Sequence, residues 1–204
     1  MRIRTGKTLI VAPHADDEVL GCHSFLGPDC HVLYLGIEDR PSTRERLEEV
    51  RRSAVKSGFR WDALDHPVNR YSVSVLIPDL ERCIAEIRPA TALIAQPSYN
   101  QDHRAAYDAA LVALRPHDRN WFVPNVLVYE QPDSVLWKHG AEAQPNWFRP
   151  VSIEDKLHSY SLYASQVRGH RSPDLVRALA RLRGAQAGME YAEGFTVLRL
   201  AEGG

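Results

Sequence analysis

Residues 8–21 read TLIVAPHADDEVLG, an apolar run that ends abruptly in a histidine, two aspartates and a glutamate. The run over residues 8–13 is short and rich in β-branched side chains, which predicts a buried strand. The segment that begins at Asp17 has the pattern of a helix. Four titratable groups in five positions are unusual beside a buried strand, because unpaired charges are unfavourable inside a protein. The stretch therefore predicts a strand, a functional loop and a helix.

Further along the chain, the same alternation of strand and helix recurs. Apolar runs occur at HVLYLGI, TALIAQP and NVLVYE, and helix-periodic stretches cover residues 17–25, 43–57, 75–87 and 102–114. Such alternation is typical of parallel strands joined by crossover helices. We therefore expect an α/β fold, a Rossmann-like sandwich with a mostly parallel sheet and helices on both faces. The active site of such a fold lies at the carboxyl ends of the strands.

The pattern changes after Glu130. A loop that contains proline and tryptophan, residues 131–150, leads to helices near residues 152–163 and 173–187 and then to a last strand, FTVLRL. No linker separates this tail from the rest of the chain. We expect a single domain over residues 1–204, with the tail closing over one edge of the sheet.

The composition is that of a globular protein. Of the 204 residues, 44% are hydrophobic and 25% charged, and the formal net charge is −1. This charge gives no general attraction to nucleic acid or to an anionic membrane, and no apolar stretch approaches the roughly twenty residues of a membrane span. The N-terminal apolar run is too short for a signal peptide. The three cysteines are odd in number and lack C-x-x-C spacing, so we expect reduced thiols in a cytoplasmic protein.

His14 and Asp17 are candidate metal ligands. A histidine and an aspartate three positions apart across a tight turn are able to converge on one point, and imidazole and carboxylate are common ligands of catalytic zinc. Asp16 and Asp17 also stand where acidic residues cap a helix N-terminus. The motif taken alone leaves both interpretations open.

A third ligand is expected at the end of another strand. The segment TALIAQPSYNQDHRAAYDAAL predicts a strand, a loop and a helix, and His103 follows its strand as His14 follows the first. Two histidines and one aspartate leave a coordination position open for water, as in a hydrolytic zinc site. Asp16 then stands beside the metal, where a general base would take a proton from that water.

Several segments together resemble a known family. PHADDEVLG followed by NQDHR resembles the PIG-L/LmbE-like family of metal-dependent N-deacetylases, whose hallmark is an A-H-P-D-D-E type motif. TRERLEEVRRSAVKSGF resembles the R-x-x-E helix of that family. IEDKLHSYSLYASQ and RLRGAQAGMEYAEGFTVLR are similar to the C-terminal blocks of its sugar-deacetylase branch. The resemblance covers nearly the whole chain and implies an N-acetylated sugar or glycoconjugate as substrate.

The resemblance also implies roles for individual residues. His14, Asp17 and His103 match the ligands of one Zn²⁺ per chain, a site that other divalent ions also fit. Asp16 matches the general base, and Arg46 matches an arginine that lies near the substrate.

Some positions depart from the family pattern. Ala15 stands where proline is usual, and Asn100 stands where many relatives carry a second histidine. Because position 100 has no histidine, another group must polarise the amide oxygen. We predict that His170, in QVRGHRSPD, supplies this catalytic function, with an arginine or a tyrosine as the alternative. Tyr99 and Asn100 are predicted to line the sugar site.

These observations predict a zinc-dependent hydrolase that acts on a linear amide. It would hydrolyse the acetamide of an N-acetylglucosamine-type sugar or conjugate to a free amine and acetate. One alternative is a non-catalytic member of the same fold that binds zinc and sugar. A nucleotide-binding Rossmann protein is a poor alternative, because PHADDEVLG places acidic groups where a glycine-rich turn would hold a pyrophosphate.

Overall fold

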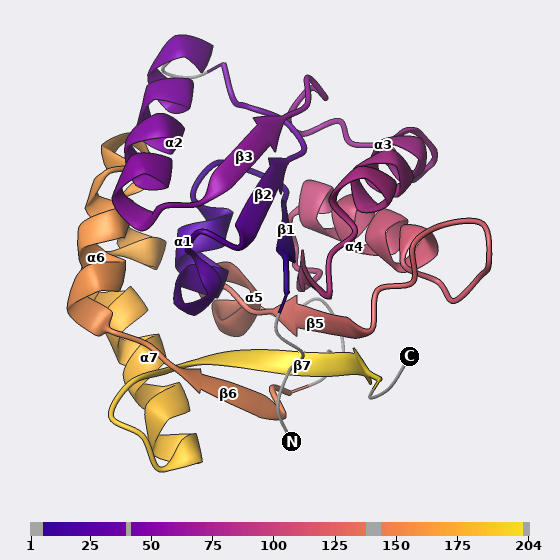
Figure 1. The fold of residues 1–204 in the computed structure, drawn as a ribbon. Helices are drawn as coiled ribbons and strands as arrows, with labels where there is room; N and C mark the ends of the chain where they lie inside the picture. The colour runs from indigo at the N-terminus through magenta and orange to yellow at the C-terminus, as the bar shows by residue number, and fades with distance from the viewer. Residues whose placement is uncertain (1–5, 40–41, 138–143, 202–204) are drawn as a thin grey trace.

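The computed structural model describes residues 6–39, 42–137 and 144–201, which form one sheet with helices on both of its faces (Figure 1). The sheet has the order β3-β2-β1-β4-β5-β7-β6. Its strands are β1 (Thr8–Ala12), β2 (Cys30–Tyr34), β3 (Arg60–Ala63), β4 (Thr91–Ala95), β5 (Asn125–Tyr129), β6 (Trp147–Pro150) and β7 (Ala192–Leu200). The α-helices are α1 (Asp17–Cys22), α2 (Thr43–Ser57), α3 (Val73–Ile87), α4 (Gln101–Ala113), α5 (Pro132–Leu136), α6 (Ile153–Ser161) and α7 (Pro173–Ala187). Short 3₁₀ turns are η1 (His23–Phe25), η2 (Ala164–Gln166) and η3 (Gly169–Arg171).

The strand order places a topological switch point between β1 and β4. From β1 the chain continues to β2 and β3 on one side, and from β4 it continues to β5 on the other, with all of these pairs parallel. Helices and loops that follow β1 and β4 therefore diverge and leave a crevice at their carboxyl ends. The prediction of a mostly parallel α/β sheet is confirmed.

Alternation along the strands explains how helices cover both faces. In β1, Ile10 and Ala12 point into a core cluster shared with α1, α2, α6 and α7. Leu9 and Val11 point into a second cluster, shared with α3 and α4. Figure 1 shows these two groups of helices on opposite faces of the sheet. Because β1 is covered on both faces, its sequence is an unbroken apolar run rather than an alternating one.

The tail closes the sheet beyond β5, as expected. Strand β7 pairs antiparallel with β5 and then with β6. The predicted loop over residues 131–150 was wrong in part, because it contains helix α5 and strand β6. Strand β3 was also missed. Both β3 and β6 are four-residue edge strands with largely exposed or half-buried side chains, so neither carries an apolar run.

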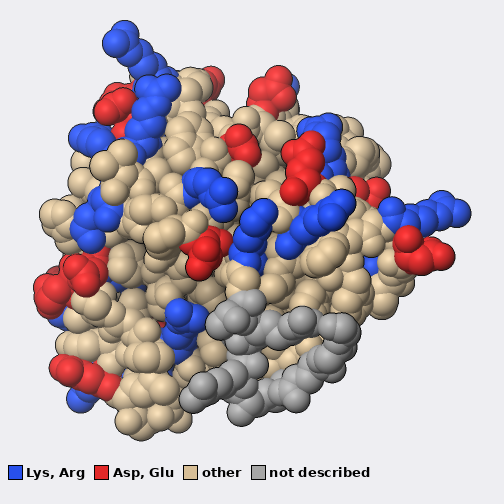
Figure 2. Space-filling model, in the orientation of Figure 1, with Lys and Arg blue, Asp and Glu red and all other residues tan. Residues whose placement is uncertain are grey.

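The surface and the thiols agree with the composition. Figure 2 shows basic and acidic side chains interspersed over one face of the molecule. Cys22, Cys30 and Cys83 are buried free thiols. Within the described ranges, none of the helices combines the length and the apolar character that crossing a membrane requires.

Candidate metal and catalytic site

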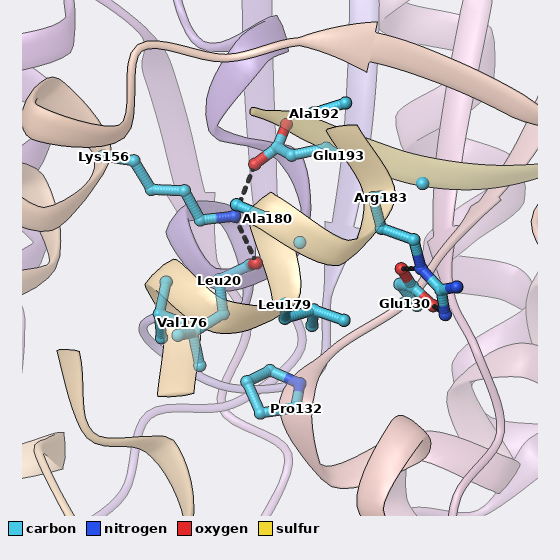
Figure 3. A pocket seen from close by; sticks show the side chains of 12 residues that line it. Leu20, Glu130, Pro132, Lys156, Val176, Leu179, Ala180, Arg183, Ala192 and Glu193 are labelled. Carbon is cyan, nitrogen blue, oxygen red and sulfur yellow. Dashed lines mark hydrogen bonds and ion pairs between the residues drawn. The ribbon is translucent and has the colours of Figure 1, made fainter. Parts of the chain in front are cut away.

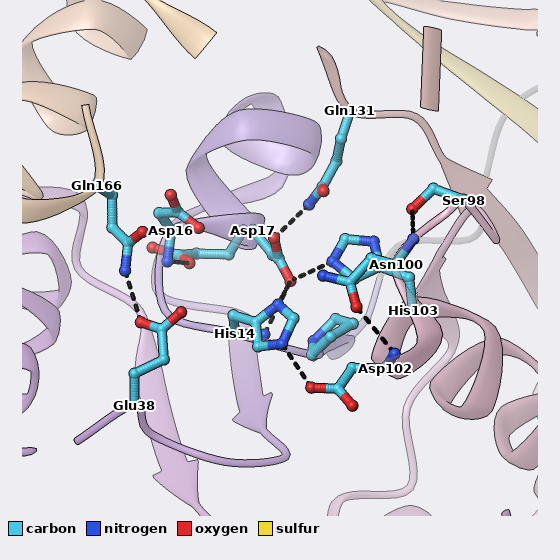
Figure 4. Close-up of polar contacts among 12 residues, drawn as sticks. His14, Asp16, Asp17, Glu38, Ser98, Asn100, Asp102, His103, Gln131 and Gln166 are labelled. Carbon is cyan, nitrogen blue, oxygen red and sulfur yellow. Dashed lines mark hydrogen bonds and ion pairs between the residues drawn. The ribbon is translucent and has the colours of Figure 1, made fainter. Parts of the chain in front are cut away.

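Three predicted ligands meet at the switch point. His14 lies in the loop after β1, Asp17 is the first residue of α1, and His103 lies in the first turn of α4. All three are buried, and one donor atom of each lies within 4.8 Å of the others. Asp17 Oδ2 is 3.7 Å from His14 Nδ1 and 3.5 Å from His103 Nε2 (Figure 4). Two nitrogen donors and one carboxylate oxygen at this spacing suit a divalent ion.

A left-handed residue makes this convergence possible. Asp16 has φ 100° and ψ −19°, a conformation that side chains other than glycine rarely adopt. The resulting turn brings the His14 backbone N–H to Asp17 Oδ2, 2.8 Å away. Asp16 makes no side-chain hydrogen bond that caps α1. Simple capping therefore does not account for Asp16.

Asp102 orients His14. His14 Nε2 donates to Asp102 Oδ2 at 3.0 Å, so His14 Nδ1 is the nitrogen that faces Asp17. Asp102 also accepts hydrogen bonds from the backbone N–H groups of Asn69, at 2.6 Å, and Tyr71, at 3.3 Å. A carboxylate behind a ligand histidine fixes the orientation of the ring and strengthens it as a donor. Asp102 is not among the site residues predicted from the sequence, although it directly precedes His103.

Gln131 performs a similar task for Asp17. Its Nε2 donates to Asp17 Oδ1 at 2.6 Å, which leaves Oδ2 directed toward the two imidazoles. Gln131 is the residue before α5 and lies in the segment expected to be a loop. No local sequence signal connects it with Asp17, because the two are 114 positions apart.

Burial is the largest single influence on the pKa of His14, His103 and Asp16. Burial opposes the charged form of His14, but its hydrogen bond to Asp102 and the charge of Asp17 favour that form, and the pKa of His14 is raised. Burial lowers the pKa of His103 despite the nearby Asp17. Burial also raises the pKa of Asp16 well above its usual value, against the opposing effect of Arg171.

The Asp16 side chain contacts Arg171, and not Asp102 or Gln131. Its Oδ2 lies 3.2 Å from Arg171 Nη1, and its buried Oδ1 has no hydrogen-bond partner in the described part of the chain. A buried carboxylate oxygen without a partner is unusual and marks a position where a ligand or water would be held. Arg171 Nη2 also donates to Gln166 Oε1 at 3.0 Å, which fixes the guanidinium beside Asp16.

His170 lies next to Arg171 but in a different environment. Its side chain is 46% exposed, and its Nε2 is 3.7 Å from Asp133 Oδ1. The structure therefore places the arginine of this turn, and not the histidine, in contact with Asp16.

The other predicted residues surround the same cleft, whose volume is about 870 Å³. Arg46 is buried and paired with Glu38 at 3.1 Å and Glu49 at 3.3 Å, and it also contacts Ser165 Oγ. The exposed Tyr99 ring lies 5.7 Å from that of Trp137, centroid to centroid. Asn100 caps α4, with Oδ1 accepting from the backbone N–H of Asp102 at 2.9 Å. The lining includes six of the eight predicted site residues: His14, Arg46, Tyr99, Asn100, His103 and His170.

A second cavity is too small to hold a substrate. It measures about 10 Å³ and lies between α1, α7 and β7 (Figure 3). Two buried ion pairs flank it: Lys156 with Glu193 at 2.6 Å, and Arg183 with Glu130 at 2.5 Å. Lys156 also donates to the Leu20 carbonyl at 2.7 Å, so this region supports the end of α1.

Comparison with known proteins gives matches in structure but not in sequence. Neither a protein-family model nor a curated protein matches the chain. N,N′-diacetylchitobiose deacetylase from Pyrococcus horikoshii superposes with a TM-score of 0.76 and 18% identity, over 95% of this chain and 84% of that one. A deacetylase of teicoplanin biosynthesis gives 0.75 and 19%, over 97% and 100%. This chain has the LmbE/PIG-L-type deacetylase fold.

The same fold also supports other chemistry. A conserved protein from Thermus thermophilus matches with a TM-score of 0.80 and 21% identity, over 98% of both chains. The 4-carboxy-2-hydroxymuconate hydratase of Pseudomonas putida matches with 0.75 and 20%, over 98% of this chain and 99% of that one. Because a deacetylase and a hydratase share the fold, the residues of the site must decide the reaction.

Proposed function

We propose that this protein is a metal-dependent N-deacetylase that converts an N-acetylglucosamine-type sugar or sugar conjugate to a free amine and acetate. The observation that carries the proposal is the buried group of His14, Asp17 and His103, with the carboxylate of Asp16 beside it. These three residues would hold the ion, and we expect Zn²⁺. When bound, the ion supplies Lewis acidity for the amide carbonyl and for water.

Asp16 is the proposed general base. It accepts a proton from water as the water oxygen attacks the acetamide carbon, and it then returns that proton to the amine nitrogen as the C–N bond breaks. Its raised pKa suits this exchange, because burial makes the carboxylate a stronger proton acceptor. Arg171, 3.2 Å away, holds the carboxylate in place.

The remaining predicted residues form the walls of the cleft. We propose that Arg46, Tyr99 and Asn100 lie along the sugar, since all three line the same cavity as His14 and His103. His170 is proposed to support the oxyanion from the cleft rim. Arg171 is the alternative donor for that role, because it lies on the same turn and contacts the catalytic carboxylate.

The deacetylases of the same fold support this proposal, since one acts on diacetylchitobiose and another belongs to teicoplanin biosynthesis. Hydration of an unsaturated carboxylate is a second candidate, as in the Pseudomonas hydratase. The observation in its favour is that the cleft is lined by arginine side chains, Arg46, Arg70, Arg168 and Arg171.

The test is release of amine from a panel of acetamido sugars by the zinc-loaded protein. We expect hydrolysis of at least one sugar, and a loss on the order of a hundredfold for Asp16→Asn, as for removal of a general base. The surface variant Asp118→Asn is the matched control. Failure of the zinc-loaded protein to release amine from any sugar, together with hydration of an unsaturated carboxylate, would replace the first candidate by the second.

A further inference from the structure

Two cleft arginines differ from the others in that their side chains have no hydrogen-bond or ion-pair partner among the described residues. Arg46 and Arg171 are paired with the carboxylates of Glu38 and Asp16. Arg70 and Arg168 also line the cavity, but their exposed side chains make no hydrogen bond or ion pair within residues 6–39, 42–137 and 144–201. Two guanidinium groups in a substrate cleft are therefore available to a ligand.

Arg70 projects from a loop that is fixed to the catalytic cluster. The backbone N–H groups on either side of it, those of Asn69 and Tyr71, both donate to Asp102, the carboxylate that orients His14. The Tyr71 hydroxyl also donates to the Pro13 carbonyl at 2.6 Å. Asn69 adopts a left-handed backbone with φ 68° to form this turn. Strained residues of this kind persist where the surrounding structure holds them and are frequent at ligand sites.

Arg168 is fixed to the other side of the cluster. Its carbonyl accepts the backbone N–H of Arg171 at 3.0 Å, and Arg171 in turn pairs with Asp16 and with Gln166. Gln166 lies two residues before Arg168, and Asp102 contacts the loop that carries Arg70. Figure 4 shows Gln166 and Asp102 on opposite sides of His14. Arg70 and Arg168 thus come from two separate loops that line the same cleft.

We propose that the cleft selects a substrate that carries an anionic group in addition to its acetamide, and that Arg70 and Arg168 bind that group. The inference rests on the proposed function for the acetamide half of the substrate. A guanidinium forms paired hydrogen bonds with the oxygens of a carboxylate or a phosphate. Glu38, Asp39 and Asp133 also line the cleft, so an anionic substrate would be repelled without these two arginines.

The experiment compares matched neutral and anionic substrates. We measure kcat/KM for N-acetylglucosamine, its 6-phosphate and the corresponding 6-carboxylate, so that the two anionic forms identify the preferred oxyanion. We expect the wild type to prefer an anionic form by about tenfold or more, mainly through KM, as for a charge-assisted hydrogen bond. Arg70→Gln and Arg168→Gln should each reduce the preference about tenfold, and added salt should reduce it as well. Arg119→Gln, in the loop before β5 at the other end of the sheet, is the matched control and should keep the preference.

A binding measurement separates this inference from the proposed function. Calorimetric titration with glucosamine and with glucosamine 6-phosphate or its 6-carboxylate needs no turnover. Equal affinity for the neutral and charged amines, or equal hydrolysis of all three acetamides, would overturn the inference. Neither result would contradict the proposed deacetylase function. Tighter binding of a charged amine that depends on Arg70, without hydrolysis of any acetamide, would support anion selection and overturn the proposed deacetylase function.

Discussion

Asp16 and Asp17 are adjacent in the chain but face different partners. Asp17 lies between two imidazoles and accepts from Gln131, whereas Asp16 lies against Arg171. Because their partners differ, we expect replacement of Asp16 and replacement of Asp17 to have different effects, although the two side chains are chemically identical.

The first prediction therefore concerns metal content. Asp17→Asn should lower zinc affinity by at least about tenfold, because it removes an anionic donor. Asp16→Asn should bind about one zinc per chain and lose turnover. Elemental analysis after dialysis against a weak chelator measures both. Full zinc occupancy in Asp17→Asn would remove this residue from the ligand set.

The second prediction concerns Arg171 and pH. The Arg171 charge lowers the pKa of Asp16, against the larger raising effect of burial. Removing it in Arg171→Gln raises the Asp16 pKa further, so the carboxylate is protonated, and unable to act as a base, at higher pH than in the wild type. The acid limb of the kcat/KM profile should move to higher pH in Arg171→Gln. In Arg171→Lys, which keeps the positive charge, the limb should lie close to its wild-type position.

His170→Gln is the matched comparison on the same turn. Its side chain does not contact Asp16, so the acid limb should stay in place while turnover falls if His170 supports the oxyanion. An identical shift in both variants would contradict the assignment of Arg171 as the residue that positions Asp16.

At the scale of the element, helix α1 is short and depends on its surroundings. The Glu193 carboxylate accepts hydrogen bonds from the backbone N–H groups of His23 and Ser24. Lys156 donates both to Glu193 and to the Leu20 carbonyl. The His23 ring packs behind this junction, with Nε2 3.1 Å from Ser159 Oγ. The helix that carries Asp17 is thus held by partners from α6 and β7.

The third prediction concerns the pH dependence of stability at this junction. Burial lowers the pKa of His23 to about 4, with Lys156 acting in the same direction and Glu193 against it. An unfolded chain protonates this histidine near pH 6.5, so between pH 6.5 and 4 the unfolded state binds a proton that the folded state excludes. Stability should therefore fall as the pH drops through this range, by on the order of 3 kcal/mol.

The variant His23→Gln tests this because glutamine does not titrate and is able to keep a hydrogen bond to Ser159. Urea unfolding from pH 7 to 4 should show a flatter dependence than in the wild type. The exposed His158→Gln is the control and should keep the wild-type slope. An unchanged slope in His23→Gln would mean that other groups cause the loss of stability in acid.

Elements covered on both faces were predictable, and edge elements were not. The runs that form β1, β2, β4 and β5 are apolar because helices bury them from both sides, and this leaves a clear sequence signal. Strands β3 and β6 lie at the two edges and have no such signal. Helix α1 was expected to continue to residue 25 but ends at Cys22, where the 3₁₀ turn η1 begins.

The same reasoning applies to the site. The convergence of His14, Asp17 and His103 was predictable because each follows a predicted strand, and parallel strands bring their carboxyl ends together. Gln131 was not, since its contact with Asp17 depends on tertiary structure alone. In the turn that holds His170 and Arg171, no sequence pattern predicts which side chain faces inward, because a 3₁₀ turn of three residues is too short to show a periodicity.

At the scale of the whole molecule, the proposed metal-binding group connects two βα units. His14 and Asp17 belong to the β1–α1 unit and His103 to the β4–α4 unit. The fourth prediction is that zinc stabilises the fold by mass action, by about 3 kcal/mol at a free concentration a hundred times the Kd. Thermal unfolding with and without zinc should show the increase in Tm, and chelation should reverse it.

The ligand variant His103→Ala should lose most of this increase, whereas the surface variant His158→Ala should retain it. An equal increase in Tm for His103→Ala would show that zinc stabilises the protein from another position.

The left-handed backbone of Asp16 has a consequence for how this sequence tolerates change. A residue selected for thermostability alone at φ 100° would be glycine, which adopts that conformation without steric conflict. The fifth prediction is that metal-free Asp16→Gly is more stable than metal-free Asp16→Ala by about 1 kcal/mol, because both lose the carboxylate and only alanine keeps the strain. Chemical denaturation measures the difference, and equal stabilities would mean that the turn is relaxed. Repeated selection for heat resistance without selection for turnover would then favour glycine at this position, giving a more stable protein that lacks the proposed general base.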